Sequence, residues 1–142
     1  MANVVELRQM SDEQLEDRLE HSREELFNLR FQQASARLQD TSRLKIVRRE
    51  IAQLSEILHK RQLAVSAAAA EPEIAAVLEG QNWQGRARYI YEDGSWDVSF
   101  LNSEGKEIVV ANVNLNRKRR SDEKPGSSAS KRRQIISFEV TG

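Results

Sequence analysis

The sequence has 142 residues but no cysteine, only two prolines and few aromatic residues. Without cysteine, disulfide bonds and thiolate zinc sites are excluded, and a reducing compartment suits the chain. Long apolar runs are also missing, and the first ten residues lack the apolar core of a signal peptide. We therefore expect a soluble, unexported protein that does not associate with a membrane.

Candidate catalytic and metal-binding residues are equally scarce. His21 and His59 are the only histidines, and neither has a second potential ligand at the spacing of a metal site. There is no glycine-rich phosphate loop, and no nucleophile and base can be paired by their spacing. We expect no enzyme, no cofactor, no metal and no small-molecule substrate.

Charge is balanced overall, with 22 basic and 22 acidic residues, but it is distributed in blocks. Residues 1–36 have four basic and eight acidic side chains, and residues 67–116 have three and eight. Residues 37–66 reverse this with seven basic and three acidic, as do residues 117–142 with eight and three. This pattern favours a polyanionic partner that meets two basic zones, although a solvated mixture of charges is the alternative.

The clearest periodic pattern lies in residues 42–58, where aliphatic residues recur at alternating steps of three and four. They are Leu44, Val47, Ile51, Leu54 and Leu58. These positions form one apolar seam along an α-helix, which requires a partner helix to cover it. The intervening positions are mostly basic, so the opposite face is predicted to bind a polyanion.

A first helix is predicted over residues 12–36. Ser11 and Gln14 have the spacing of a capping box, and acidic residues in the first turns suit the helix dipole. The helix repeats the steps of four and three at Leu15, Leu19, Ser22, Leu26 and Leu29. Phe27 and Phe31 are expected to widen its apolar face.

The break between the two helices is short, and its Asp40, Thr41 and Ser42 are good helix caps. A short connection makes neighbouring helices antiparallel, so Leu44 should meet the end of the first helix. The sequence thus predicts an antiparallel two-helix hairpin over residues 1–66.

The remaining chain predicts an α+β fold. Residues 67–82 are alanine-rich with Pro72 and are expected to be a semi-rigid linker. Residues 83–116 alternate with period two between turn sequences, which predicts a small antiparallel meander that resembles SH3-like or Tudor-like barrels. Residues 117–142 read as a basic, flexible tail in which residues 134–140 could add a last strand.

The aromatic residues of the meander allow two interpretations. They could form a cage or a base-stacking platform, or they could be the core of a small sheet with few other large residues. The second interpretation is favoured. The residues are Trp83, Tyr89, Tyr91, Trp96 and Phe100.

Two stretches also carry a resemblance to a known family. Residues 25–32 read ELFNLRFQ, and residues 43–52 read RLKIVRREIA and are followed by Leu54 and Leu58. In order and spacing, these stretches resemble the first- and second-helix signatures of the bacterial-type ribosomal large-subunit protein twenty-nine family. The resemblance covers residues 1–66 and leaves the rest as an atypical C-terminal extension.

The resemblance implies a structural constituent of the large ribosomal subunit, located in the cytoplasm on the ribosome. It implies contact with large-subunit rRNA near the peptide exit tunnel, beside a neighbouring tunnel-rim ribosomal protein. Nascent chains, chaperones and targeting factors would pass close by, and the extension would make extra rRNA or protein contacts. The alternative is a non-ribosomal coiled-coil adaptor with a small peptide- or nucleic-acid-binding β module.

Phosphate binding is predicted for arginine and lysine side chains on the two helices and in the tail, because guanidinium and ammonium groups bind phosphate oxygens. The predicted rRNA-binding residues are Arg30, Arg37, Arg43, Lys45, Arg48, Arg49, Lys60, Arg61, Arg117, Lys118, Arg119, Arg120, Lys131, Arg132 and Arg133.

Overall fold

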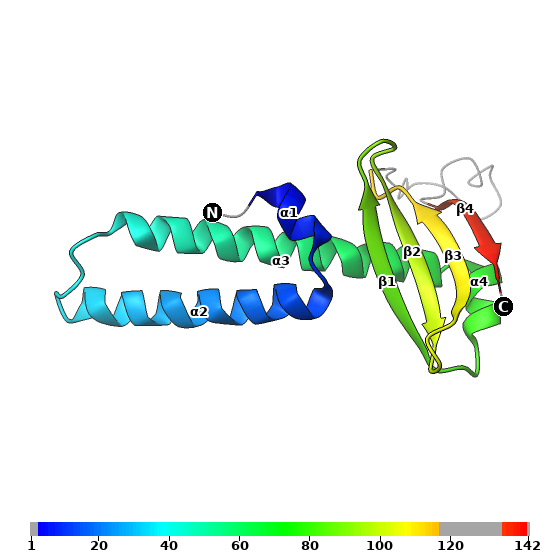
Figure 1. The fold of residues 1–142 in the computed structure, drawn as a ribbon, viewed down its shortest axis with the longest axis horizontal. Coiled ribbons are helices and arrows are strands. Elements are labelled where there is room, and N and C mark those ends of the chain that lie inside the picture. The colour runs from blue at the N-terminus through cyan, green and yellow to red at the C-terminus, as the bar shows by residue number, and fades with distance from the viewer. Residues whose placement is uncertain (1–2, 117–134, 142) are drawn as a thin grey trace, which may run out of the picture. The chain divides into compact units, whose positions relative to one another are not determined.

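The computed structural model describes residues 3–116 and 135–141, and the chain divides into two compact units, residues 1–60 and 61–142 (Figure 1). Helices precede strands, so the predicted α+β class is confirmed. The elements are α1 (Val4–Gln9), α2 (Asp12–Ala34), α3 (Ser42–Ala69), α4 (Pro72–Leu78), β1 (Trp83–Ile90), β2 (Ser95–Asn102), β3 (Glu107–Val113) and β4 (Ile135–Val140). Helix α3 begins in the first unit and ends in the second.

Helix α2 begins at the predicted capping box. The Gln14 backbone N–H donates to Ser11 Oγ at 3.3 Å, and the Ser11 N–H donates to Gln14 Oε1 at 3.1 Å. Each side chain therefore satisfies one of the backbone donors that a helix start leaves without a partner. At the other end, Ala36 has a φ of 56° and turns the chain out of the helix.

In the first unit, α2 and α3 lie side by side and share two buried clusters (Figure 1). Near the connection, Leu29 of α2 packs with Leu44 and Val47 of α3. The second cluster joins the beginning of α2 to a later stretch of α3 and contains Leu7, Leu15, Leu19, Leu54 and Ile57. Most of the predicted seam positions thus provide apolar contacts, but Ile57, which was not predicted, is buried, and Ile51 and Leu58 are only partly buried.

Helix α1 precedes the first predicted helix and was not predicted. The Val5 N–H donates to the Asn3 side chain at 3.3 Å, which caps this short helix. Its Leu7 is buried with the cluster around Leu15 and Leu54. Only six residues long, α1 offers too few turns for a periodic signal.

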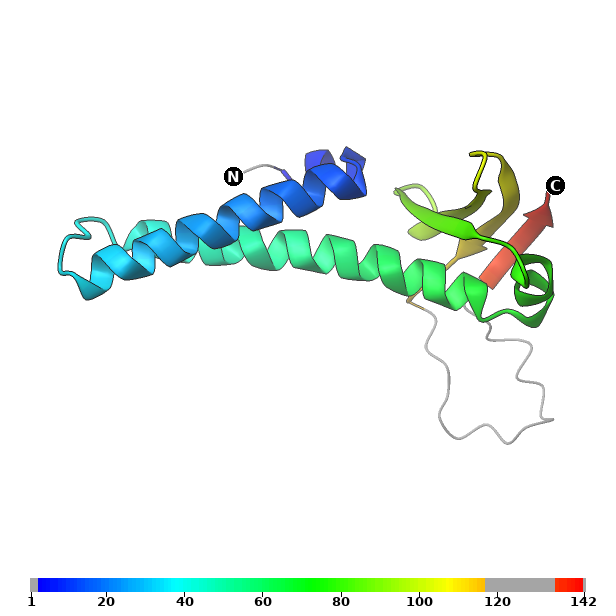
Figure 2. The same ribbon diagram turned by 90° about the horizontal axis from the view of Figure 1, so that it is seen from below.

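The second unit contains one four-stranded sheet with the order β1-β2-β3-β4, and every neighbouring pair is antiparallel. Figure 2 shows its strands curving over the last turns of α3 and over α4. Buried side chains from the strands, including Val98, Phe100 and Val109, form one core with Ala64, Ala68, Ile74 and Leu78. A thin meander is not stable alone and needs a further strand or a covering layer. In this unit the fourth strand and the helices behind the sheet provide both.

The end of α3 and the helix α4 occupy the expected linker at residues 67–82, and both are part of this core. Ala68 and Ile74 are fully buried, and Leu78 is 5% exposed. The small alanine side chains allow the end of α3 to lie close against the sheet. From composition alone, this packing role cannot be distinguished from that of a spacer. Pro72 occupies the first turn of α4, where it is well tolerated.

Strand β4 lies where the alternation of residues 134–140 indicated, and it pairs with β3 from Val109 opposite Val140 to Val113 opposite Ile135. The rest of the expected tail, residues 117–134, falls outside the described residues.

Candidate nucleic-acid interface

The exposed side of α3 carries three neighbouring cations, Lys45, Arg48 and Arg49. At about 100° per residue, Lys45 and Arg49 lie opposite Leu44 and Val47, whose burial fixes the orientation of the helix. Arg48 lies between them and the buried seam. Arg48 is three residues and Arg49 four residues after Lys45, so the three occupy adjacent turns. None of them forms an ion pair with another residue in the described part of the chain.

Two other predicted RNA-binding residues do have acidic partners. Arg43 donates from Nε and from a terminal nitrogen to Glu25 Oε1, at 2.7 and 2.6 Å, and thereby links α3 to α2. Lys60 Nζ lies 3.2 Å from Glu56 Oε1, one turn away. Ion pairs this exposed contribute only about 0–1 kcal/mol each, so a phosphate could replace either carboxylate.

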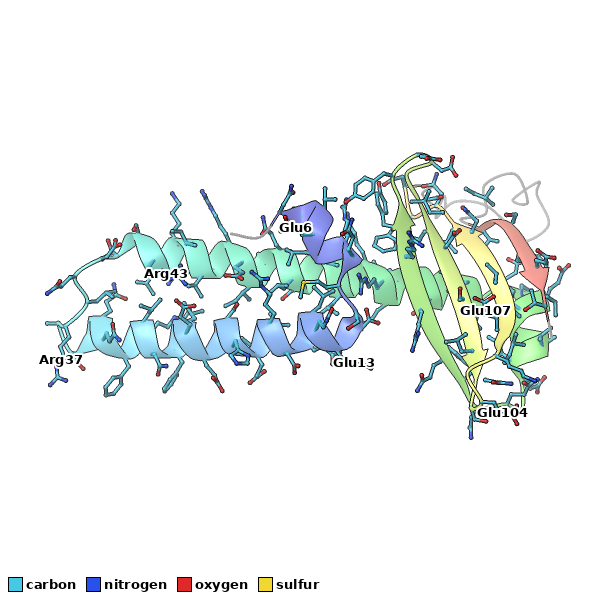
Figure 3. All side chains as sticks on the ribbon, in the orientation of Figure 1. Glu6, Glu13, Arg37, Arg43, Glu104 and Glu107 are labelled. Carbon is cyan, nitrogen blue, oxygen red and sulfur yellow. The ribbon has the colours of Figure 1, made fainter. Side chains whose placement is uncertain are left out.

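Arg30 and Arg37 are exposed on α2 and in the connection that follows it. Figure 3 shows Arg37 at the end of the first unit where the chain turns from α2 to α3. Its backbone N–H donates to the Gln32 carbonyl at 2.9 Å, which holds the start of this turn. Both side chains therefore belong to the same end of the helix pair as Arg43.

Arg61 does not lie on the exposed basic face. Its side chain is only 7% exposed and takes part in interactions within the structure, so it is not presented to solvent as the prediction required. The sequence contained a signal for this, because Arg61 follows Leu58 by three residues and so continues the seam of α3. At this position, the place of the residue around the helix determines its burial more than its charge does. The tail residues 117–120 and 131–133 lie outside the described part of the chain.

Phe27 and Phe31 do not widen the buried face of α2 as predicted. Their side chains are 70% and 65% exposed and turn away from the seam that contains Leu19 and Leu29. Phe27 follows the seam position Leu26 by one residue, and one residue turns the side chain by about 100°. The position of the two rings on the helix, and not their apolar character, therefore decides that they are exposed.

The aromatic residues of the sheet pack on each other. Trp96 is 4% exposed and Phe100 fully buried in the core. Trp83 meets Phe100 edge to face at 5.2 Å between ring centres, and Tyr89 meets Trp96 at 5.1 Å. Edge-to-face pairs use the rings for mutual packing, so a core role fits Trp96 and Phe100, whereas Trp83 and Tyr91 are 39% and 52% exposed.

Within residues 3–116 and 135–141, no group of three or more potential ligands is placed to hold a metal ion. None of the helices in those ranges has the length and apolar character that crossing a membrane requires.

Comparison with known proteins places the first unit among ribosomal proteins, a structural class without enzymatic activity. The chain belongs to the ribosomal L29 protein family, whose profile matches residues 5–61. This membership confirms the resemblance found in the sequence and the expectation that the chain is not an enzyme. The profile ends where the second unit begins.

Several relatives carry the name large ribosomal subunit protein uL29. The protein of Mycolicibacterium vanbaalenii is 52% identical over 62 residues, which is 44% of this chain and 80% of the relative. The protein of Mycobacterium ulcerans is 47% identical over 68 residues, covering 48% and 85%. The protein of Mycolicibacterium smegmatis is 46% identical over 68 residues, covering 48% and 88%.

Proposed function

We propose that this chain is a structural constituent of the large ribosomal subunit and that the exposed face of α3 binds large-subunit rRNA. Family membership and the names of the relatives support the ribosomal role. One structural observation carries the RNA-binding part. Lys45, Arg48 and Arg49 are exposed on adjacent turns, and none has an acidic partner among the described residues.

The chemistry of these side chains suits the phosphate backbone. Each guanidinium presents paired N–H donors to two phosphate oxygens, and each neutralised phosphate releases condensed counterions. The buried contacts of Leu44 and Val47 hold α3 against α2, so the cations start from a rigid helix. Binding then orders only the side chains, which keeps the entropic cost low.

The finer location is proposed from the resemblance. The helix pair would be the antiparallel hairpin of the family, seated near the peptide exit tunnel beside a tunnel-rim ribosomal protein. Nascent chains, chaperones and targeting factors would then pass near it.

The second unit would act as an added module that makes further rRNA or protein contacts. We also propose that its curved antiparallel meander is of the SH3-like kind, which the β1-β2-β3-β4 order supports. The functional boundary would fall near residue 60, with the basic tail segments as additional phosphate ligands.

The test is sedimentation of the full chain with large ribosomal subunits at moderate and high salt. Charge reversal by Arg48→Glu and Arg49→Glu should remove co-migration, because it sets two anions against phosphate. A single Arg49→Glu should weaken binding and reduce the slope of log affinity against log salt by about 1.

A matched control is available in the second unit. Arg88 is exposed on β1 and lies opposite Asp97 in the strand register, so Arg88→Glu makes the same charge change outside the proposed site. This variant should sediment with the subunit as the unmodified chain does. Equal sedimentation of all the variants would exclude the role proposed for α3.

A further inference from the structure

The outward side of α2 has a second surface that RNA binding by α3 leaves unexplained. Phe27 and Phe31 are one turn apart on this side and largely exposed. Beside Phe27 lies a shallow depression of about 360 Å³, lined by Glu20, Arg23, Glu24, Phe27 and Asn28. Two neighbouring exposed rings are unusual on a small folded unit and indicate an interaction surface.

The charges around these rings are mainly acidic. Exposed carboxylates on α2 precede the rings along the helix: Glu13, Glu16, Asp17, Glu20 and Glu24. Two exposed cations flank Phe27: Arg23, whose guanidinium lies 3.8 Å from Glu20, and Arg30, three residues after Phe27. The five carboxylates outnumber these two cations, so the field on this side of α2 is on balance repulsive to phosphates and is unsuited to an RNA backbone.

A second copy of the chain does not fit either. Two such faces would bring like charges together, which disfavours self-association. A buried aromatic ring contributes about 150–250 Å², so two rings give roughly 300–500 Å². A stable dimer interface needs about 800 Å² from each partner.

We propose that the outward face of α2 docks a basic protein segment of a neighbouring component in the assembled particle. The aliphatic stems of lysine or arginine would pack on Phe27 and Phe31, with the cations over the ring faces. Their charged ends would reach Glu20 and Glu24, which gives charge-assisted hydrogen bonds. This inference rests on the proposed function, because the partner is met in the large subunit.

The experiment places a photo-reactive benzoylphenylalanine at position 28 of the full chain, replacing Asn28. This position lines the depression and leaves both phenylalanines intact. Purified large subunits are irradiated, the products are digested with ribonuclease or protease, and the attached peptide is identified by mass spectrometry. A second probe at position 52, in place of the exposed Ala52 one turn after Arg48 and Arg49, reports separately on the α3 face and keeps its three cations.

We expect a ribonuclease-resistant cross-link from position 28 to a lysine- or arginine-rich protein segment. Phe27→Ser with Phe31→Ser should lower its yield at least fivefold, as should Glu20→Lys with Glu24→Lys. Because these four side chains are exposed or half exposed, the variants should keep their helix content by circular dichroism.

A cross-link from position 28 to RNA, to a second copy or to an acidic segment would overturn the docking proposal, and so would no cross-link. A yield that does not change in the two double variants would overturn it as well. The position 52 probe is read separately. If it fails to attach to RNA, the RNA-binding role of α3 is lost, whatever position 28 shows.

Discussion

Gly85 of β1 lies so close to Val65 of α3 that a Cβ atom on Gly85 would be 2.4 Å from Val65 Cγ1. Real Cβ atoms do not approach another heavy atom this closely. Gly85 does not have a positive φ, in contrast to Gly80, Gly94 and Gly105, so its backbone does not require glycine. The missing side chain instead allows the helix and strand of the second unit to approach each other.

Gly85→Ala should therefore destabilise the second unit by about 1–3 kcal/mol, the usual cost of overpacking a filled core. Val65→Ala removes the two methyl groups that the new Cβ would meet. Because the two positions are in contact, the double variant should be more stable than the sum of the single changes predicts. Urea unfolding of the four proteins measures this coupling, and strictly additive effects would contradict the packing account.

Arg18 and Glu50 join α2 to α3 through a contact of 3.0 Å in which the glutamate side chain is only 16% exposed. Double-mutant cycles with alanine should give a coupling near the upper end of the roughly 0.2–1 kcal/mol range for such pairs. The matched control is the pair Arg23 and Glu20, which is 3.8 Å apart and more exposed. The coupling energy of this control pair should be close to zero. If it equals the coupling energy of Arg18 and Glu50, burial does not strengthen the Arg18–Glu50 ion pair.

Asp40 precedes α3 and accepts hydrogen bonds from the Ser42 hydroxyl at 2.5 Å and the Ser42 backbone N–H at 3.0 Å. These bonds favour the carboxylate and hold the pKa of Asp40 below its ordinary value of 3.8. Since the folded pKa is depressed, the contribution to stability is present above pH about 4 and is lost as pH falls through the folded pKa.

NMR titration of the Asp40 carboxyl carbon measures this shift directly. Asp40→Asn keeps an acceptor oxygen but cannot titrate. The stability difference between the two proteins should therefore shrink as the pH falls below 4. A midpoint for Asp40 at or above 3.8 would contradict the assigned hydrogen bonds.

The sequence was most informative where several local signals agreed. At the start of α2, the Ser11 cap, the acidic first turn and the seam beginning at Leu15 all indicate the same helix, and the structure has it. Residues such as Phe27 and Arg61 were misassigned, because their type suggested one environment and their helical phase another. In both cases the position of the residue around the helix determined whether its side chain is buried or exposed.

Other features depend on contacts that no local pattern encodes. The burial of Ala64, Ala68 and Ile74 exists because a sheet formed later in the chain covers them. Likewise, the ion pair between Arg43 and Glu25 depends on how α2 and α3 pack against each other. Only the structure therefore shows which basic residues have an acidic partner and which do not. The candidate RNA face could be listed from sequence, but its separation into these groups could not.

The pairing of β4 with β3 also orders events during folding. Short turns join β1 to β2 and β2 to β3, whereas residues 114–134 separate β3 from β4, so the last pairing must close the longest loop of the sheet. Until β4 pairs, β3 is a sheet edge with unpaired backbone donors and acceptors, beside the apolar side chains of Val109 and Ala111. The folding chain is thus most prone to aggregation just before its last strand arrives, and β4 covers that edge of β3 when it pairs.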